Sequence, residues 1–367
     1  MRQIAVLGGG NGAMATAAHM SLKGHKVHLY NRSYEKLLPI VKTGGIRIKG
    51  VFGENLINIE KITDNMEEAI LGAEVIILVV PSTAHEFYGN ILAKLLKDGQ
   101  ILLLNPGHTG GALHMATVLK EKGLKAKITI CETSSLTYIC RITDIAEVTI
   151  YGETKDLPFG VFPSNDIDYI NPIIKELYPF VKPVRNVLET SLMNVNAIMH
   201  PPGMILNAAQ IERTEGDFYF YYDGTTEAVA KLMQEVDMER LKILKAAKLN
   251  TITFLELFYK WGSTTKEAFE KGSIYDALKQ SAPNRWIKSP KKLKDRYLDE
   301  DIQYGLVPMS EVGDLLGVEV PTINSLIKIA SVINGIDYRE QGLNLRRLGL
   351  EGISFYEMQN YLDNGSI

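Results

Sequence analysis

The sequence predicts an α/β domain with a mostly parallel, doubly wound sheet, followed by an all-α domain. In the first half of the chain, short apolar runs alternate with helical segments, which is typical of buried parallel strands joined by crossover helices. From about Val184 this alternation gives way to a succession of helical segments. We therefore expect one domain over residues 1–183 and a second, helical domain over residues 184–367.

The first stretch of the chain has a glycine-rich turn between a strand and a helix. The apolar run 3–7 leads directly into Gly8-x-Gly10-x-x-Ala13, and a helix of small residues follows. Gly8 permits the tight turn, Gly10 lets a pyrophosphate approach the backbone, and Ala13 allows close helix–strand packing. This predicts a Rossmann dinucleotide site; the alternative is a close helix–strand crossing without a ligand. The expected contacts within the turn are Gly8, Gly10, Asn11, Gly12 and Ala13.

The end of the second strand bears on the choice of coenzyme. NAD-binding proteins commonly place an acidic residue there to hold the ribose hydroxyls, whereas this chain has Asn31 and Arg32. No carboxylate would repel a 2′-phosphate, and Arg32 could pair with one. We therefore expect NADPH in preference to NADH. The alternative is that Arg32 is an ordinary solvated surface charge.

Two further apolar runs end in residues suited to the rim of the same site. The run 74–80 ends at Val80-Pro81, and the run 100–104 ends at Asn105. Ligands of open α/β sheets bind beyond the carboxyl ends of the strands, so we expect Val80, Pro81 and Asn105 to approach the coenzyme.

Other short runs extend the predicted sheet structure. Residues 46–48 and 56–59 alternate in polarity and predict an accessory hairpin. Residues 148–151 and 158–162 are expected to add strands that close the main sheet.

Composition limits the classes of partner. The net charge of −3 gives no basis for nucleic acid or membrane binding, and no apolar run reaches membrane-spanning length. Two cysteines and no metal-ligand spacing predict reduced thiols and no metal site. We expect a cytoplasmic protein that acts on small molecules. The oligomeric state stays open, with a homodimer among the alternatives.

His200 is distinguished by its context. It ends a helical run that begins near Asn194, and Pro201 disfavours helical geometry at the preceding residue. The imidazole is therefore expected at a helix end or kink, with the amide of Asn196 nearby. The alternative is a buried structural histidine in a helix joint.

A second group of candidates lies about a hundred positions later. Residues 296–308 combine an arginine, three acids and two tyrosines. One carboxylate could orient a histidine, and one guanidinium could grip a substrate carboxylate. The alternative is a solvated acidic loop.

These motifs together resemble those of the opine dehydrogenase family, which includes octopine and N-(1-carboxyethyl)-amino-acid dehydrogenases. The similarity spans nearly the whole chain, and its most specific parts are Asn196-x-x-x-His200-Pro201 and Arg296-x-x-x-x-Asp301 before Gly305. The resemblance implies that His200 and Asp301 are a catalytic pair and that Arg296 contacts the substrate. It also implies a Rossmann domain followed by a helical one. Asn196 is a further candidate for substrate binding.

Members of that family reduce the imine formed between an amino acid and a 2-oxo acid, with hydride from NADH or NADPH. The resemblance therefore implies an oxidoreductase acting on a CH–NH bond. Two other classes stay open: a ketopantoate-type or 3-hydroxy-acid reductase, and a dinucleotide-sensing module without catalysis. The first would often use a lysine in the first helix of the second domain, and residues 188–207 contain none.

Overall fold

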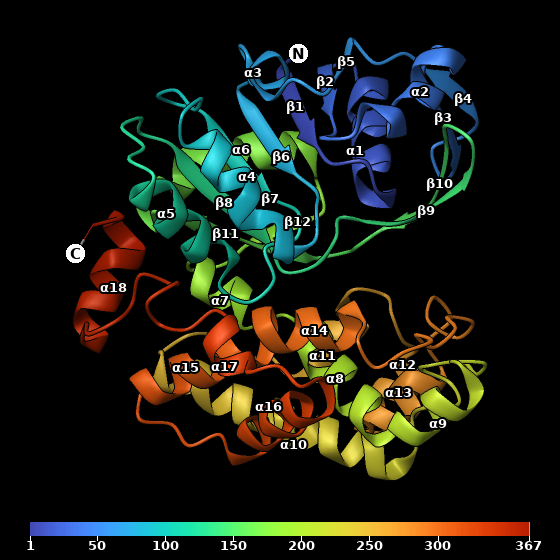
Figure 1. Cartoon of the computed structure of the whole chain (residues 1–367), viewed down its shortest axis with the longest axis vertical. Coiled ribbons are helices and arrows are strands. Elements are labelled where there is room, and N and C mark those ends of the chain that lie inside the picture. Colours follow the sequence, from blue (N-terminus) through green and yellow to red (C-terminus); the bar gives the residue numbers. More distant parts are fainter. Residues whose placement is uncertain (367) are drawn as a thin grey trace. The chain divides into compact units, whose positions relative to one another are not determined.

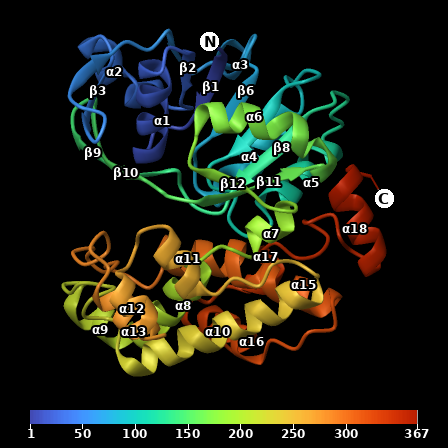
Figure 2. The same cartoon turned by 180° about the vertical axis from the view of Figure 1, so that it is seen from behind.

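The computed structural model describes residues 1–366, which form two compact units (Figures 1 and 2). Unit 1 comprises residues 1–107, 111–187 and 361–366, and unit 2 comprises residues 108–110 and 188–360. The strands belong to unit 1, and unit 2 is helical. The predicted fold class, a mostly parallel α/β domain followed by a helical domain, is confirmed.

Unit 1 is built on a sheet of eight strands. Their spatial order is β12 (Val181–Pro183), β11 (Leu157–Phe162), β8 (Thr129–Thr133), β7 (Ile101–Leu104), β6 (Val75–Leu78), β1 (Gln3–Leu7), β2 (Lys26–Tyr30) and β5 (Lys61–Thr63). Neighbouring strands run parallel except for β11 with β8. Strands β6, β7 and β8 are buried throughout, as expected for strands covered on both faces.

Six α-helices accompany these strands in the described part of unit 1: α1 (Asn11–Leu22), α2 (Leu38–Thr43), α3 (Met66–Ile70), α4 (His85–Leu92), α5 (Gly111–Glu121) and α6 (Ile167–Leu177). Short 3₁₀ turns cover Tyr34–Lys36, Ser82–Ala84 and Ser164–Asp166.

A second, four-stranded sheet has the order β4 (Asn55–Ile57), β3 (Ile46–Gly50), β10 (Glu147–Glu153) and β9 (Tyr138–Asp144). The predicted accessory hairpin is confirmed as the antiparallel pair β3–β4. The expectation that residues 148–151 close the main sheet was wrong, because β10 pairs with β3 and β9 instead. Its residues alternate between buried Val148 and Ile150 and more exposed positions, which is typical of a strand covered on one face.

Helix α1 contacts strands of both sheets, and its residues from Gly12 to Met20 are all buried. A helix covered on several sides has no polar face, so its small side chains allow both sheets to approach.

Unit 2 contains α8 (Asn196–Leu206), α9 (Ala208–Thr214), α10 (Glu227–Ala246), α11 (Phe254–Lys260), α12 (Lys266–Glu270), α13 (Ile274–Lys279), α14 (Arg296–Asp301), α15 (Val307–Leu315), α16 (Pro321–Asn334) and α17 (Tyr338–Gln341). A π-helical segment, Ile302–Leu306, joins α14 to α15. Helices α7 (Val187–Ser191) and α18 (Phe355–Asn364) each include residues of both units. Helix α8 contacts α10, α14 and α16.

A buried arginine fixes the chain just before α8. Arg240 of α10 is fully buried and donates to Asp237 Oδ1 at 2.6 Å and 2.9 Å. It also donates to the carbonyls of Leu192 at 2.7 Å and Ile252 at 2.6 Å. Because a buried charge is stable only when it is paired and hydrogen-bonded, these acceptors explain why an arginine is tolerated here.

Within residues 1–366, none of the helices combines the length and apolar character needed to span a bilayer.

Candidate active site

The glycine-rich turn between β1 and α1 is closed on one side and open on the other. Gly8 has φ +143°, and a Cβ there would lie 2.3 Å from the Val79 carbonyl oxygen. A Cβ on Gly12 would lie 2.7 Å from Leu136 Cδ1. A Cβ on Gly10 would meet no described atom within 4 Å. The start of α1, including buried Ala13, is thus packed against the protein, while the backbone at Gly10 is accessible to a phosphate.

Asn11 is the first residue of α1. Its Oδ1 accepts a hydrogen bond from the backbone N–H of Ile142 in β9 at 2.8 Å. The side-chain oxygen therefore fastens the small sheet to α1, and the backbone and the amide nitrogen are the groups that remain for a ligand.

The end of β2 presents one amide and one cation. Asn31 is buried, and its Oδ1 accepts from the backbone N–H of Ser33 at 2.9 Å. Arg32 is exposed, with its guanidinium carbon 5.6 Å from the centre of the Phe87 ring. The cation is thus held near an aromatic face at the strand end.

The ends of β6 and β7 differ in accessibility. Val80 is half-buried and Pro81 is exposed, so both are accessible. Asn105 is fully buried and its amide is used internally: Nδ2 donates to Thr137 Oγ1 at 2.9 Å, and Oδ1 accepts from Thr137 N at 3.1 Å. Its side chain therefore braces the loop that follows β8.

His200 lies within α8, so the expectation that it would stand at a helix end was wrong. The helix continues through Pro201 and Pro202. The two prolines lack the N–H groups that would bond to the carbonyls of Ala197 and Ile198, and their rings crowd those carbonyls. Close packing against Phe220 helps to keep the helix continuous, because a Cβ on Gly203 would lie 2.7 Å from Phe220 Cζ.

The structure brings His200 and Asp301 together in unit 2. The distance from His200 Nδ1 to Asp301 Oδ2 is 2.6 Å, and both side chains are buried. His200 Nε2 lies 2.7 Å from Tyr221 Oη, and the ring stacks on Tyr297 with 3.8 Å between ring centres. An imidazole oriented by a carboxylate is a common general acid–base.

Asp301 ends α14, so residues 296–308 are not a solvated acidic loop. Asp295 caps this helix, and the π-helical segment that follows it has a kink at Tyr304, with φ −112° and ψ 15°, before α15 begins. A π-helical insertion is rare and is often found at functional sites.

Each of the three consecutive acids of α14 has a different partner. Asp299 accepts from Tyr338 Oη and from Asn334 Nδ2. Glu300 is buried, and its Oε1 lies 3.5 Å from His108 Nε2. Asp301 pairs with His200. One turn of helix thus reaches α16 and α17, the segment after β7, and α8.

The predicted substrate residues lie beside this turn. Arg296 is 64% exposed, and its Nε is 3.6 Å from Glu300 Oε2. Asn196 is half-buried at the first position of α8, and its backbone N–H donates to Asn194 Oδ1 at 3.1 Å.

The sequence-based interpretation did not single out Tyr221. The residue lies in a run of five aromatic residues, 218–222, just before Asp223-Gly224. Such a run next to a turn could have been recognised as a candidate site element. Nothing in the spacing showed which of the aromatic rings would reach the imidazole.

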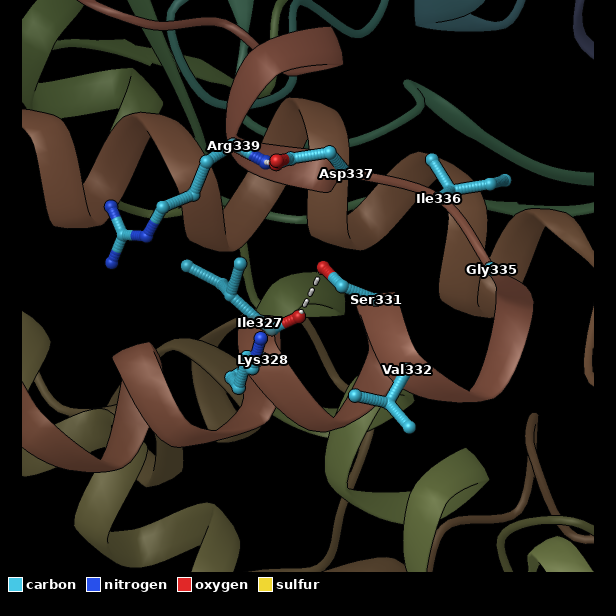
Figure 3. A pocket seen from close by; sticks show the side chains of 8 residues that line it. All are labelled: Ile327, Lys328, Ser331, Val332, Gly335, Ile336, Asp337 and Arg339. Carbon is cyan, nitrogen blue, oxygen red and sulfur yellow. Dashed lines mark hydrogen bonds between the residues drawn. The ribbon is translucent and has the colours of Figure 1, made fainter.

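A cavity of about 400 Å³ opens between the C-terminal part of α16 and the start of α17 (Figure 3). Ile327, Lys328, Ser331, Val332, Gly335, Ile336, Asp337 and Arg339 line it. None of the predicted site residues is among them. Within residues 1–366, no cluster of three or more metal-ligating side chains was found.

A glycine-rich βαβ unit together with a helical unit that carries a carboxylate–imidazole pair defines a class: two-domain, nicotinamide-dependent dehydrogenases. Comparisons with known proteins agree with this class. The profile described as NAD-dependent glycerol-3-phosphate dehydrogenase N-terminus matches residues 3–136. The profile described as NAD/NADP octopine/nopaline dehydrogenase, alpha-helical domain, matches residues 183–334.

The chain is 35% identical to an opine dehydrogenase of Arthrobacter sp. (strain 1C) over 352 residues, which covers 95% of this chain and 96% of that protein. It therefore belongs to the opine dehydrogenase family. Among solved structures, octopine dehydrogenase with NADH and L-arginine matches with a TM-score of 0.79 at 18% identity, covering 98% of each chain. Yersinopine dehydrogenase with NADP⁺ matches with a TM-score of 0.72 at 13% identity, covering 99% of this chain and 98% of that one. At these identities the structural matches show a shared fold.

Proposed function

We propose that the protein is an NAD(P)H-dependent opine dehydrogenase, which joins an amino acid to a 2-oxo acid by reducing the imine between them. The observation that carries the proposal is the buried His200–Asp301 pair, 2.6 Å apart, in a chain of this family. Residues 1–183 would bind the coenzyme and residues 184–367 the substrates.

The turn at Gly8 to Ala13 fits a dinucleotide, since it leaves the backbone at Gly10 open in front of a helix N-terminus. When bound, the coenzyme supplies the hydride that reduces the C=N bond.

His200 would serve as the general acid–base for imine formation. Its Nδ1–H donates to Asp301, which fixes the tautomer and stabilises the imidazolium. Protonation of the carbinolamine hydroxyl lets water leave and forms the iminium. Burial of His200 and Asp301 excludes bulk water and strengthens their interaction.

Both substrates carry carboxylates, and Arg296 is the proposed partner for one of them. Its pairing with Glu300 uses Nε, which leaves the terminal amino groups of the guanidinium for a carboxylate. Asn196, at the start of α8, is proposed to hold the other side of the substrate through its amide.

We propose NADPH as the preferred coenzyme. Support comes from the strand end after β2, where exposed Arg32 stands in place of the acid that NAD-binding proteins use. The value of kcat/KM should be higher with NADPH than with NADH. Arg32→Ala should lower the ratio of these two values. A clear preference for NADH in the wild-type protein would contradict the assignment.

The deciding experiment is a panel of 2-oxo acids assayed with and without amino acids, with coenzyme oxidation followed at 340 nm. An opine dehydrogenase needs both partners for turnover. Turnover with an oxo acid alone would support a ketopantoate-type or 3-hydroxy-acid reductase. Coenzyme binding without any turnover would support a sensing module. Light scattering of the same sample would determine the oligomeric state, for which a homodimer is one alternative.

A further inference from the structure

Both ring nitrogens of His200 are occupied, which restricts how its proton can leave. Nδ1 is 2.6 Å from Asp301 Oδ2, and Nε2 is 2.7 Å from Tyr221 Oη. Tyr297 stacks on the ring in a nearly parallel arrangement, with 4° between the planes. A proton exchanged between the imidazole and a substrate must therefore pass through the Tyr221 hydroxyl, unless that buried side chain moves away.

We propose that Tyr221 is a catalytic residue whose hydroxyl relays the proton between His200 Nε2 and the substrate. This inference rests on the proposed function, because the substrate is taken to be a carbinolamine formed from an amine and a 2-oxo acid.

A phenol suits this position because it both donates and accepts a hydrogen bond. When His200 is neutral with its proton on Nδ1, the Tyr221 O–H donates to Nε2. When His200 is an imidazolium, Nε2–H donates to the Tyr221 oxygen, and the phenolic hydrogen turns outward. The same 2.7 Å contact serves both states, which differ by one proton on the ring.

The relay step balances in atoms and charge. The Tyr221 O–H bond breaks as its proton bonds to the carbinolamine hydroxyl. The C–O bond then breaks, water leaves, and the nitrogen lone pair forms the C=N bond of the iminium. The His200 Nε2–H proton moves to the Tyr221 oxygen and restores the phenol. The positive charge passes from the imidazolium to the iminium.

The surroundings of Tyr221 favour a relay over a persistent phenolate. Burial, with neighbouring Tyr297 and Asp301, raises the pKa of Tyr221 well above its ordinary value. The phenol therefore gives up a proton only as it receives another. The hydroxyl of half-buried Tyr297 is 3.5 Å from Tyr221 Oη, at the limit of a hydrogen bond, so a substrate oxygen could compete for the phenolic hydrogen.

The backbone around Tyr221 is held against α8, which opposes movement of the ring. A Cβ on Gly203 would lie 2.7 Å from Phe220 Cζ, so no space separates the aromatic run from the helix. Asn207 Nδ2, at the end of α8, donates to the Gly224 carbonyl at 2.8 Å on the other side of the run. These contacts favour a phenol that stays in place while protons move through it.

The test compares Tyr221→Phe with Tyr222→Phe as a matched control. The Tyr222 ring lies 4.7 Å from Lys279 Nζ and 4.8 Å from Arg285 Cζ, and each variant removes one hydroxyl from the same run. For Tyr221→Phe we expect kcat of the two-substrate reaction to fall about a hundredfold, with KM and coenzyme affinity changed less than about threefold. Tyr222→Phe should match the wild type.

Replacing Tyr221 with 3-fluorotyrosine distinguishes a hydroxyl that only positions His200 from one that relays a proton. This residue keeps the hydrogen bond but makes the phenol more acidic. A relay predicts that kcat changes with the acidity of the phenol, because its O–H bond breaks during the reaction. A wild-type kcat with 3-fluorotyrosine, or nearly full turnover of Tyr221→Phe, would overturn the relay while leaving the proposed function intact.

If the wild-type protein turned over no pair of amine and oxo acid, the proposed function would fail instead. The hydrogen bond between Tyr221 and His200 Nε2, on which the relay depends, would then be tested separately by ¹⁵N NMR of the His200 ring. The Nε2 signal should change between wild type and Tyr221→Phe across the imidazole titration. An unchanged signal would overturn it.

Discussion

At the scale of single residues, the site depends on which proton each nitrogen of His200 carries. The Asp301 carboxylate accepts only, so it selects Nδ1–H; in the proposed mechanism this leaves Nε2 to exchange protons. The Oδ1 atom of Asp301 is buried and has no hydrogen-bond partner among the described residues. The carboxylate is thus held through Oδ2, by the imidazole.

His200→Ala should therefore lower kcat by about a hundredfold to ten-thousandfold, the usual range for a lost acid–base group. Asp301→Asn should lower it as well, because an amide can donate to Nδ1 and so favours the wrong tautomer. Coenzyme affinity, measured by fluorescence titration, should not change in either variant. Asp314→Asn, an exposed position on α15, is the control. Wild-type turnover of His200→Ala would make this histidine structural.

The sequence alone could nominate His200, by its residue type and neighbouring prolines, and residues 296–308, by their acids; the choice of Asp301 among these acids came from the family resemblance. It could not show that His200 and Asp301 meet, since they are 101 positions apart and the contact depends on how α8 and α14 pack. For the same reason, the sequence could not show that Tyr221 contacts His200. The choice among neighbouring aromatic rings is made by tertiary contacts and leaves no trace in the spacing.

At the scale of elements, the distance between α8 and the π-helical segment is set by a glycine. A Cβ on Gly305 would lie 2.8 Å from Ala197 Cβ and 3.8 Å from Asp301 Cβ. Contacts below 3.0 Å force a shift of one of the elements. Helix α8 also continues through His200 and Pro201, so the helical context outweighs the local preference of the residue before a proline.

Gly305→Ala should push this segment away from α8 and lengthen the His200–Asp301 hydrogen bond. We expect stability to fall by about 1–3 kcal/mol, as for other overpacked positions, and kcat to fall more than coenzyme affinity. Denaturant unfolding and steady-state kinetics would measure both. Gly317→Ala on the same unit has open space but φ +67°, so it should lower stability without a selective loss of kcat. Equal losses of kcat in the two variants would contradict the idea that Gly305 sets the distance between α8 and the π-helical segment.

At the scale of the whole molecule, a histidine in α1 couples stability to pH. His19 Nδ1 is 2.7 Å from Tyr138 Oη, and the ring stacks on Phe52 at 3.7 Å. Burial, with nearby Lys23, lowers the pKa of His19 from its ordinary value of 6.5 to about 4. Between these values the unfolded chain binds more protons than the folded one, so stability falls as the pH drops from about 6.5 to about 4.

Wild-type protein should thus lose more unfolding free energy between pH 7 and pH 5 than His19→Gln, by about 1 kcal/mol after allowance for solvent screening. Urea unfolding followed by far-UV circular dichroism measures this difference. Both tryptophans, Trp261 and Trp286, lie in unit 2, so their fluorescence would not report on α1 directly. Equal pH dependence in the two proteins would contradict a buried, neutral His19.

Much of the fold could be predicted because its signals are local. Within residues 3–30, the glycine positions and the apolar runs predict the strand, the turn and the helix. The small sheet was only half anticipated. Its hairpin is contiguous in sequence, but β10 joins it from about a hundred residues away by pairing with β3, and no periodicity records that choice.

The turn of α14 that holds Asp299, Glu300 and Asp301 has a consequence for how the chain can vary. Successive positions on a helix differ by about 100° of rotation. Inserting one residue between Asp295 and Asp299 would therefore place Glu300 where Asp301 faces the imidazole, and deleting one residue would place Ile302 there. Single substitutions within residues 295–299 should be tolerated, but the number of residues in this stretch should be almost constant among active members of the family. Length variation there would mark relatives that have abandoned this chemistry.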